Sequence, residues 1–260
     1  MADAATNEPR LTGQVPLYKT VEPLNRQKHA KYGVNAVSSP FTFLKEWHFV
    51  PAIAAEFPVA CGSYPIVFLG ENKMPVVVMG LRAGSNLFVT DGQFDHDHYI
   101  PAYVRRYPFV SAANPDGQPS TICIDVGAEF VVTENAERPF FDENGEPTEY
   151  TQSAIDFVSA FERDAKATEA FVERVTALDL FEKKDIRVGN PNDPDNPVKV
   201  ADYFGISQEK LTALSDDKIL EMHKNGDLGV ITAHLISLQR WERVMRRVAE
   251  DVQASQPAGA

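Results

Sequence analysis

The spacing of apolar residues changes part-way along the chain, and this change limits the folds that the sequence can adopt. Between residues 40 and 135, apolar runs of strand length alternate with turns that contain Pro or Gly, which is typical of antiparallel strands. From about residue 151 to 178 the apolar residues recur at steps of three and four, which predicts one long amphipathic helix. Because the strands come first and the helices last, the sequence predicts an α+β fold. In the predicted fold, the long helix and a C-terminal helical cluster pack on an antiparallel meander sheet in the N-terminal half.

The strand-rich half can be divided into elements by its turns. Residues 42–50 alternate as in a strand, and Pro51 fits the first turn of a short helix that ends or kinks at Pro58. Pro101 begins a further helical turn. The meander consists of residues 65–70, 75–81 and 86–90, and two more strands are predicted at 109–113 and 120–126, with a turn at 114–117 between them.

The helix-rich half begins with the long helix and continues with short extended pieces at 186–188 and 198–204, which a Pro- and Asp-rich turn separates. Three helices follow. Ser207 is predicted to cap the first, Ser215 the second, which ends at Asn225 and Gly226, and Asp227 the last, whose apolar stripe covers 228–245.

A chain of 260 residues is within the size of one domain. We expect a single domain over residues 15–250, β-rich at 40–135 and helix-rich at 150–250. The polar, aperiodic ends at 1–14 and 251–260 are predicted to be mobile tails.

The charge balance excludes several classes of partner. The net charge is −12, and it is uneven, with 10 basic and 9 acidic residues up to 110, against 15 and 28 after it. Such a chain repels nucleic acid and anionic lipid surfaces. No apolar run approaches the ~20 residues of a membrane helix, and the N-terminus lacks the basic and apolar regions of a signal peptide. Cys61 and Cys123 have no metal-ligand spacing, so we expect reduced cysteines in a cytoplasmic protein.

The acidic residues are densest between Asp116 and Glu149, where nine acids face only Arg138. This segment is predicted to be a solvated loop, and the alternative is a surface for a basic partner.

Two histidines form the most evident candidate metal cluster. In the run from Asp95 to His98, His96 and His98 are two residues apart, and on an extended strand they would face the same way, as two imidazole ligands of a metal must. The Asp-Gly-Gln before them and Pro101 after them instead indicate a solvated surface turn, which we favour. We therefore predict no metal and no other cofactor, and metal binding by His96 and His98 is the alternative.

Adjacent arginines form the candidate ligand site. Arg105 and Arg106 point about 100° apart if they are helical, so one can pair inside the fold while the other faces outward. The inner one is predicted to pair with Asp125 or Glu56. The alternative is a guanidinium that stacks on tyrosine and holds a carboxylate of a small ligand or peptide. The candidate ligand-binding residues are Arg82, Tyr103, Arg105, Arg106 and Tyr107.

Catalytic signatures of hydrolases and nucleotide-binding enzymes do not occur in the sequence. His234 follows the apolar stripe of the last helix and is predicted to be a core histidine, and His223 is predicted to stabilise a helix C-terminus. No catalytic residue is predicted.

Three blocks, EFPVACGSYPIVF, GLRAGSNLFVTDGQF and YIPAYVRRYPF, lie in this order between Glu56 and Phe109. In these blocks, and in PLYKTVEPLN and the KLTALSDDKILEMHKNGDLGVITAHLISL segment, the chain resembles the SapC family of bacterial proteins. It departs from the family at Phe94, where SapC-like sequences usually have Trp. The family has no established biochemical activity. It is associated with surface-layer gene clusters and with loci for TonB-dependent uptake receptors.

The resemblance implies a non-catalytic cytoplasmic accessory protein that binds a protein or small ligand in a bacterial surface-layer or nutrient-uptake system. The alternative is an enzyme of unknown reaction on a peptide or amino acid, with Arg105 or Arg106 anchoring a carboxylate.

Overall fold

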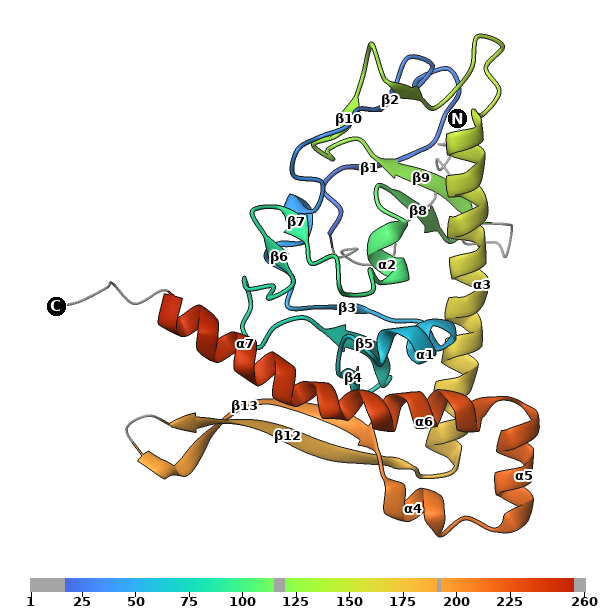
Figure 1. Ribbon diagram of the computed structural model, residues 1–260. Helices are drawn as coiled ribbons and strands as arrows, with labels where there is room; N and C mark the ends of the chain where they lie inside the picture. The colour runs from blue at the N-terminus through green and yellow to red at the C-terminus, as the bar shows by residue number, and fades with distance from the viewer. Residues whose placement is uncertain (1–16, 115–119, 191–192, 255–260) are drawn as a thin grey trace, which may run out of the picture. The chain divides into compact units, whose positions relative to one another are not determined.

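The computed structural model describes residues 17–114, 120–190 and 193–254 (Figure 1). The Cα packing divides the chain into two compact units, the first from residues 1–43 and 105–162, the second from 44–104 and 163–260. The sheets are antiparallel and most helical residues follow residue 148, so the predicted α+β class is confirmed. The single-domain assignment stays a prediction. The predicted N-terminal tail lies outside the described residues, and the last helix continues to Ala254, past the start of the predicted C-terminal tail.

The first unit contains two small sheets. In one, β9 (Thr121–Asp125) lies between β1 (Val21–Pro23) and β8 (Phe109–Ala112). In the other, β2 (Gly33–Val34) lies between β10 (Val131–Val132) and β11 (Arg138–Pro139). Gly33 is required there, because a Cβ atom at this position would overlap backbone atoms of β11. The predicted strands at 109–113 and 120–126 are confirmed, and most of the turn predicted at 114–117 lies outside the described residues.

The core of the first unit packs beside the start of the long helix α3 (Glu149–Ala177), which confirms the helix predicted at 151–178. Val158 of α3 is fully buried in a cluster with Phe109 of β8 and with Phe140 and Phe141, which follow β11. The buried cluster consists of Val34, Phe109, Ile124, Phe140, Phe141 and Val158.

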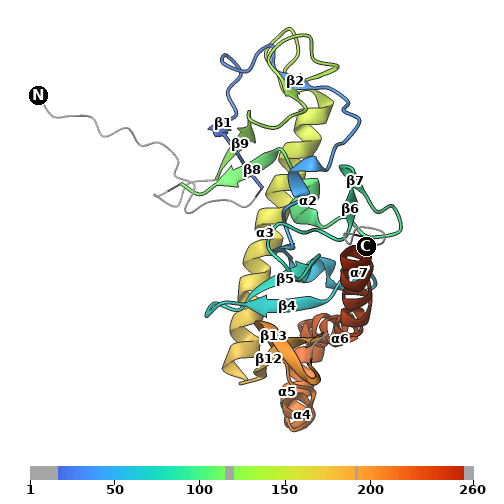
Figure 2. The same ribbon diagram turned by 90° about the vertical axis from the view of Figure 1, so that its left-hand side faces the viewer.

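The second unit is built on a five-stranded antiparallel sheet, in the order β12-β13-β4-β5-β3. Its strands β13, β4 and β5 follow one another in Figure 2. Strands β4 (Ile66–Leu69) and β5 (Met74–Val78) form the predicted hairpin, and its turn uses left-handed backbone at Gly70 and Lys73. Strands β12 (Phe181–Asn190) and β13 (Asp193–Ile206) form a second, longer hairpin. The predicted short pieces at 186–188 and 198–204 are therefore parts of two long strands.

The third strand of the meander was predicted at 86–90, and this prediction is wrong. Strand β6 (Val89–Thr90) pairs with β7 (Gln93–Phe94) in a separate two-stranded sheet, and β3 (Phe49–Pro51) takes the place next to β5. One hydrogen bond joins this segment to the end of β5, from Leu87 N–H to Met79 O, and the side-chain amide of Asn86 donates instead to the carbonyl oxygens of Leu44 and Trp47.

The segment from 42 to 60 also differs from the prediction. The 3-10 turn η1 (Thr42–Leu44) replaces the first part of the predicted strand. Pro51 lies in β3, at the edge of the sheet, where the missing N–H of proline is tolerated. The helical residues begin later, in η2 (Ala54–Glu56) and α1 (Phe57–Ala60), with Pro58 in the first turn of α1 rather than at its end.

The C-terminal helices of the second unit are α4 (Gln208–Thr212), α5 (Asp216–Lys224), α6 (Asp227–Ser237) and α7 (Trp241–Ala254). Ser207 accepts the backbone N–H of Lys210, which confirms it as an N-cap, and Ser215 occupies the N-cap position of α5. Asp227 is not the cap of α6, because Gly226 takes that position with φ 86°. The predicted last helix is divided by the 3-10 turn η3 (Leu238–Arg240), and its parts follow one another nearly in line (Figure 1).

Candidate functional site

Arg105 and Arg106 divide between solvent and interior, as helix geometry predicts. They lie at the end of α2 (Ala102–Arg105), the short helix that begins after Pro101. Arg105 is exposed, and its Cζ atom lies 4.9 Å from the centre of the Phe157 ring. Arg106 is 8% exposed and lies between two rings, 4.5 Å from Phe161 and 5.7 Å from Tyr18. Aromatic stacking thus positions both guanidinium groups.

The predicted ion pair between an arginine and Asp125 is wrong. Asp125 is fully buried and is surrounded by four donors, none of which is an arginine. Its Oδ2 accepts the backbone N–H of Lys19 at 2.8 Å and the hydroxyl of Tyr107 at 3.1 Å. Its Oδ1 accepts the backbone N–H groups of Thr20 at 2.7 Å and Gly127 at 3.0 Å. Among the acidic residues that the structure describes in the segment predicted to be solvated, at 116–149, Asp125 is therefore the exception.

Glu56, the other predicted partner, belongs to the second unit. Its carboxylate accepts the backbone N–H groups of Ile53 and Ala102 and the hydroxyl of Tyr99. It thereby fixes the starts of two short helical segments, η2 and α2, and has a structural role.

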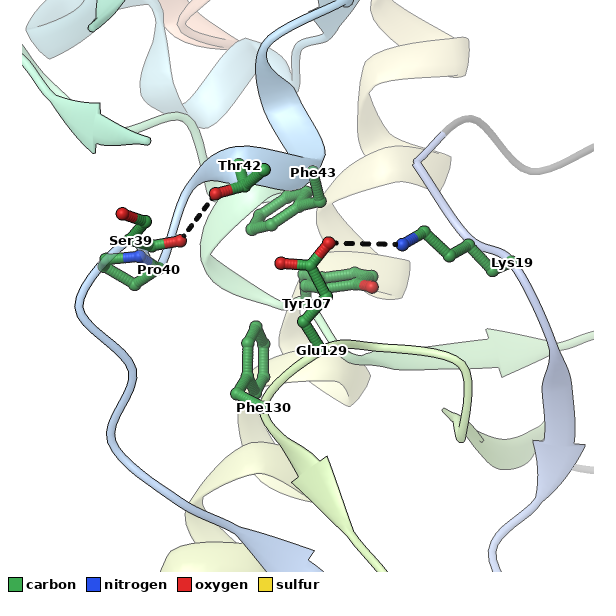
Figure 3. Close-up of a pocket in the computed structure, with 8 residues that line it drawn as sticks. All are labelled: Lys19, Ser39, Pro40, Thr42, Phe43, Tyr107, Glu129 and Phe130. Carbon is green, nitrogen blue, oxygen red and sulfur yellow. Dashed lines mark hydrogen bonds and ion pairs between the residues drawn. The ribbon is translucent and has the colours of Figure 1, made fainter. Parts of the chain in front are cut away.

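Tyr107 is part of an aromatic cluster in the first unit (Figure 3). Its ring is stacked on Phe43, with centres 4.1 Å apart, and meets Phe130 edge to face. Burial and the neighbouring Asp125 raise the pKa of its hydroxyl. The cavity beside it has a volume of about 10 Å³, and a cavity of that size holds about one water molecule. It is lined by Lys19, Ser39, Pro40, Thr42, Phe43, Tyr107, Glu129 and Phe130.

The other two candidate ligand-binding residues lie in the second unit. Arg82 is exposed beside the turn at Ala83 and Gly84, and Tyr103 of α2 is 4% exposed. The ligand-binding role of the five predicted residues stays a prediction.

The two histidines of the candidate metal cluster have opposite environments. The side chain of His96 is 92% exposed, as the predicted surface turn requires, whereas that of His98 is 9% exposed. His98 Nδ1 lies 3.1 Å from Asp95 Oδ2, and its Nε2 lies 2.9 Å from Nη1 of Arg243. Because an arginine can only donate, Nε2 accepts and Nδ1 carries the hydrogen that faces Asp95. Burial lowers the pKa of His98, so its imidazole is neutral at pH 7.

A metal site also requires several ligand side chains that lie close together. The described residues contain no group of three or more His, Cys, Asp or Glu side chains that could hold a metal ion. The His96 and His98 metal alternative stays a prediction.

Asp95 is the centre of a charged network that the sequence analysis did not identify. Its Oδ2 accepts Nη2 of Arg247 at 2.6 Å. Arg247 also donates to the carbonyl oxygen of Leu87 and lies 4.4 Å from the Phe88 ring. Burial alone would raise the pKa of Asp95, but hydrogen bonds from Arg247, the Asp97 backbone and His98 outweigh it and lower the pKa to about 2. The periodic arginines of α7 were the signal in the sequence, although nothing in their spacing shows which carboxylate they meet.

A cleft with a volume of about 790 Å³ lies beside this ion pair, within the second unit. Its charged side chains have both signs. The lining residues are Lys45, Gly84, Ser85, Asn86, Leu87, Val89, Thr90, Asp91, Asp95, Arg247 and Glu250.

Comparison with known proteins gives one match. The family model of SapC matches residues 24–244 of the 260. The chain belongs to the SapC family. No curated protein and no solved structure matches it. Asp95 and most of the cleft lining lie within the SapC match, whereas Arg247 and Glu250 lie after its last residue.

Two further predictions about this SapC-family chain can be compared with the structure. His234 is a core histidine, as predicted, because it is fully buried and both ring nitrogens are bonded, to Ile66 O and to the N–H of Ile206. Burial lowers its pKa to about 4. None of the helices in the described residues has the length and apolar character needed to cross a bilayer.

Proposed function

We propose that this SapC-family chain is a non-catalytic binding protein whose ligand occupies the cleft beside Asp95 and Arg247. The volume of the cleft, about 790 Å³, supports this proposal, because pockets for small molecules span roughly 300–1,000 Å³. We further propose that the protein is a cytoplasmic accessory component of a bacterial surface-layer or TonB-dependent nutrient-uptake system. The family resemblance is the support for that setting.

The charges of the cleft favour a zwitterionic ligand such as an amino acid or a short peptide. Asp95 and Arg247 pair with one another at 2.6 Å. Lys45 then supplies a positive charge, and Asp91 and Glu250 supply negative charges along the same lining. A ligand that carries an ammonium and a carboxylate group can match both signs.

The protonation states in the cleft favour binding over catalysis. A general acid or base works best when its pKa is near the operating pH. The pKa of Asp95 is about 2, and an arginine does not deprotonate, so neither member of the ion pair exchanges a proton at pH 7.

An enzyme is the alternative, and one observation favours it. The contact between Asp95 and Nδ1 of His98 is the arrangement in which a carboxylate orients a histidine base. In the structure Nε2 of that histidine faces Arg243 at 2.9 Å, so this arginine would have to move before Nε2 could accept a proton.

Filling the cleft should weaken ligand binding. A panel of the free amino acids and of simple dipeptides is titrated into the protein by calorimetry, and at least one compound should bind. Thr90 is exposed and lines the cleft, so Thr90→Trp should weaken that binding by about tenfold or more by occupying its volume. Thr212→Trp, an equal substitution at an exposed position of α4, is the control and should bind normally.

Three results would contradict the proposal. They are an absence of binding by every compound, equal binding by both tryptophan variants, and recovery of a bound compound in chemically altered form. The last would favour the enzyme alternative.

The cytoplasmic setting gives a second expected result. The native protein, detected in cells that express it naturally, should remain in the supernatant when the cell lysate, with its membranes, is centrifuged at high speed. A predominant recovery in the membrane pellet, released by detergent and not by salt, would be incompatible with this setting.

A further inference from the structure

We infer that Arg240 and Arg243 form a binding site for a small dianionic oxyanion of the phosphate type. Both arginines extend from the η3 and α7 segment to the same loop. Arg240 Nε donates to the carbonyl oxygen of Cys61 at 3.3 Å, and Arg243 Nη1 donates to that of Gly62 at 3.3 Å. Because these carbonyl groups belong to consecutive residues, the two guanidinium groups are neighbours.

The charges of these two arginines are not compensated by a carboxylate. Within the described residues, neither Arg240 nor Arg243 forms an ion pair, whereas the next two arginines of the helix do. Arg247 pairs with Asp95 at 2.6 Å, and Arg246 lies 3.9 Å from Glu250. Burial and the positive charges of Arg240, Arg247 and Arg246 lower the pKa of Arg243 more than the charge of Asp95 raises it, so positive charge is in excess around this guanidinium.

The hydrogen-bonding capacity of the pair also exceeds what the fold uses. A guanidinium group has five N–H donors. In the described part of the chain, Arg240 uses Nε, and Arg243 uses Nη1, which it directs to Gly62 O and to His98 Nε2. The Nη groups of Arg240 and the Nε and Nη2 groups of Arg243 remain for a ligand. Since their neighbours already fix both side chains, little conformational entropy is lost when an anion binds.

The number of charges identifies the ligand class. Two uncompensated guanidinium groups match an anion of charge −2 with several acceptor oxygens, which describes a phosphate monoester better than a monocarboxylate. The net charge of −12 opposes association with an anionic lipid surface, but it does not prevent a small ion from reaching a local contact. The site is distinct from the cleft, because neither arginine lines it.

Titration with sodium sulfate tests this inference. Sulfate stays a dianion throughout the neutral pH range, and the Nε–Hε signals of arginine in NMR spectra report binding at individual side chains. At constant ionic strength, sulfate should cause saturable shifts that are lost in Arg240→Gln and in Arg243→Gln, with affinity reduced by about tenfold or more. Arg243→Lys keeps the charge but loses the planar fork, and it should bind with intermediate affinity. Sodium acetate should bind more weakly than sulfate.

Arg246→Gln is the matched control, because this arginine lies on the same helix, is exposed and should not contact the ion. In this variant the saturable shifts of Arg240 and Arg243 should remain, and any loss of affinity should be far smaller than in Arg240→Gln or Arg243→Gln. The inference would be overturned by an absence of saturable shifts in the natural protein, by shifts that persist in both Arg240→Gln and Arg243→Gln, or by acetate binding as tightly as sulfate. Because Arg240 has no contact with His98 among the described residues, Arg240→Gln stays informative if Arg243→Gln disturbs folding.

Discussion

Replacement of Asp125 by asparagine should lower the free energy of unfolding by about 3 to 5 kcal/mol, because two of the four hydrogen bonds to this buried carboxylate are lost. The amide has nearly the same shape as the carboxylate. One oxygen becomes an NH2 group, which faces donors from the backbone or from Tyr107. The loss is therefore in hydrogen bonding and charge and not in packing. Urea denaturation of the full chain measures it.

Asp142→Asn is the control for this substitution. Asp142 also accepts backbone N–H groups, from Asn144 and Glu146, but it is exposed to solvent. Water can replace a lost hydrogen bond there, so its midpoint in urea should change little. Equal shifts of the midpoint in the two variants would show that burial of Asp125 does not determine its contribution.

Arg106→Ala should lower the free energy of unfolding by about 2 to 4 kcal/mol, whereas Arg105→Ala should change it by less than about 1 kcal/mol. Arg106 is 8% exposed and lies between the rings of Tyr18 and Phe161, so the variant loses two desolvated cation–π contacts and leaves a cavity. Arg105 is exposed, and its Cζ atom lies 4.9 Å from the centre of the Phe157 ring.

Thermal or urea denaturation of the two variants, measured side by side, tests this difference. If both variants lose the same stability, the exposed arginine is as important to the fold as the buried one. If neither loses stability, the aromatic contacts of Arg106 contribute nothing measurable.

Local signals in the sequence were sufficient for the helices. The steps of three and four residues predicted α3, and Ser207 and Ser215 marked the starts of α4 and α5, because an N-cap is determined by neighbouring residues. Local signals did not predict which strands pair. The segment at 86–90 has the composition of a strand, but the amide of Asn86 binds carbonyl groups about 40 residues earlier in the chain. No local pattern contains such a contact.

In the candidate sites, too, the contacts between residues far apart in the sequence could not be predicted. The spacing of Arg105 and Arg106 predicted that one would be inside and one outside, and the exposures agree. Which group would surround the inner guanidinium could not be predicted, since Phe161 belongs to a helix that begins more than 40 residues later. The pair of Asp95 and Arg247 joins residues 152 positions apart, and a pairing over that distance is set by the folded structure.

That long separation has a consequence for synthesis of the protein. Asp95 and the strands beside the cleft leave the ribosome well before α7, the helix that supplies Arg247. Until that helix is made, the carboxylate has no arginine partner and the cleft lacks the side chains of α7. A chain that stops before residue 241 should therefore be unable to hold a ligand there, however well its earlier parts have folded. The proposed ligand binding would therefore distinguish chains that contain α7 from translation products that stop before it.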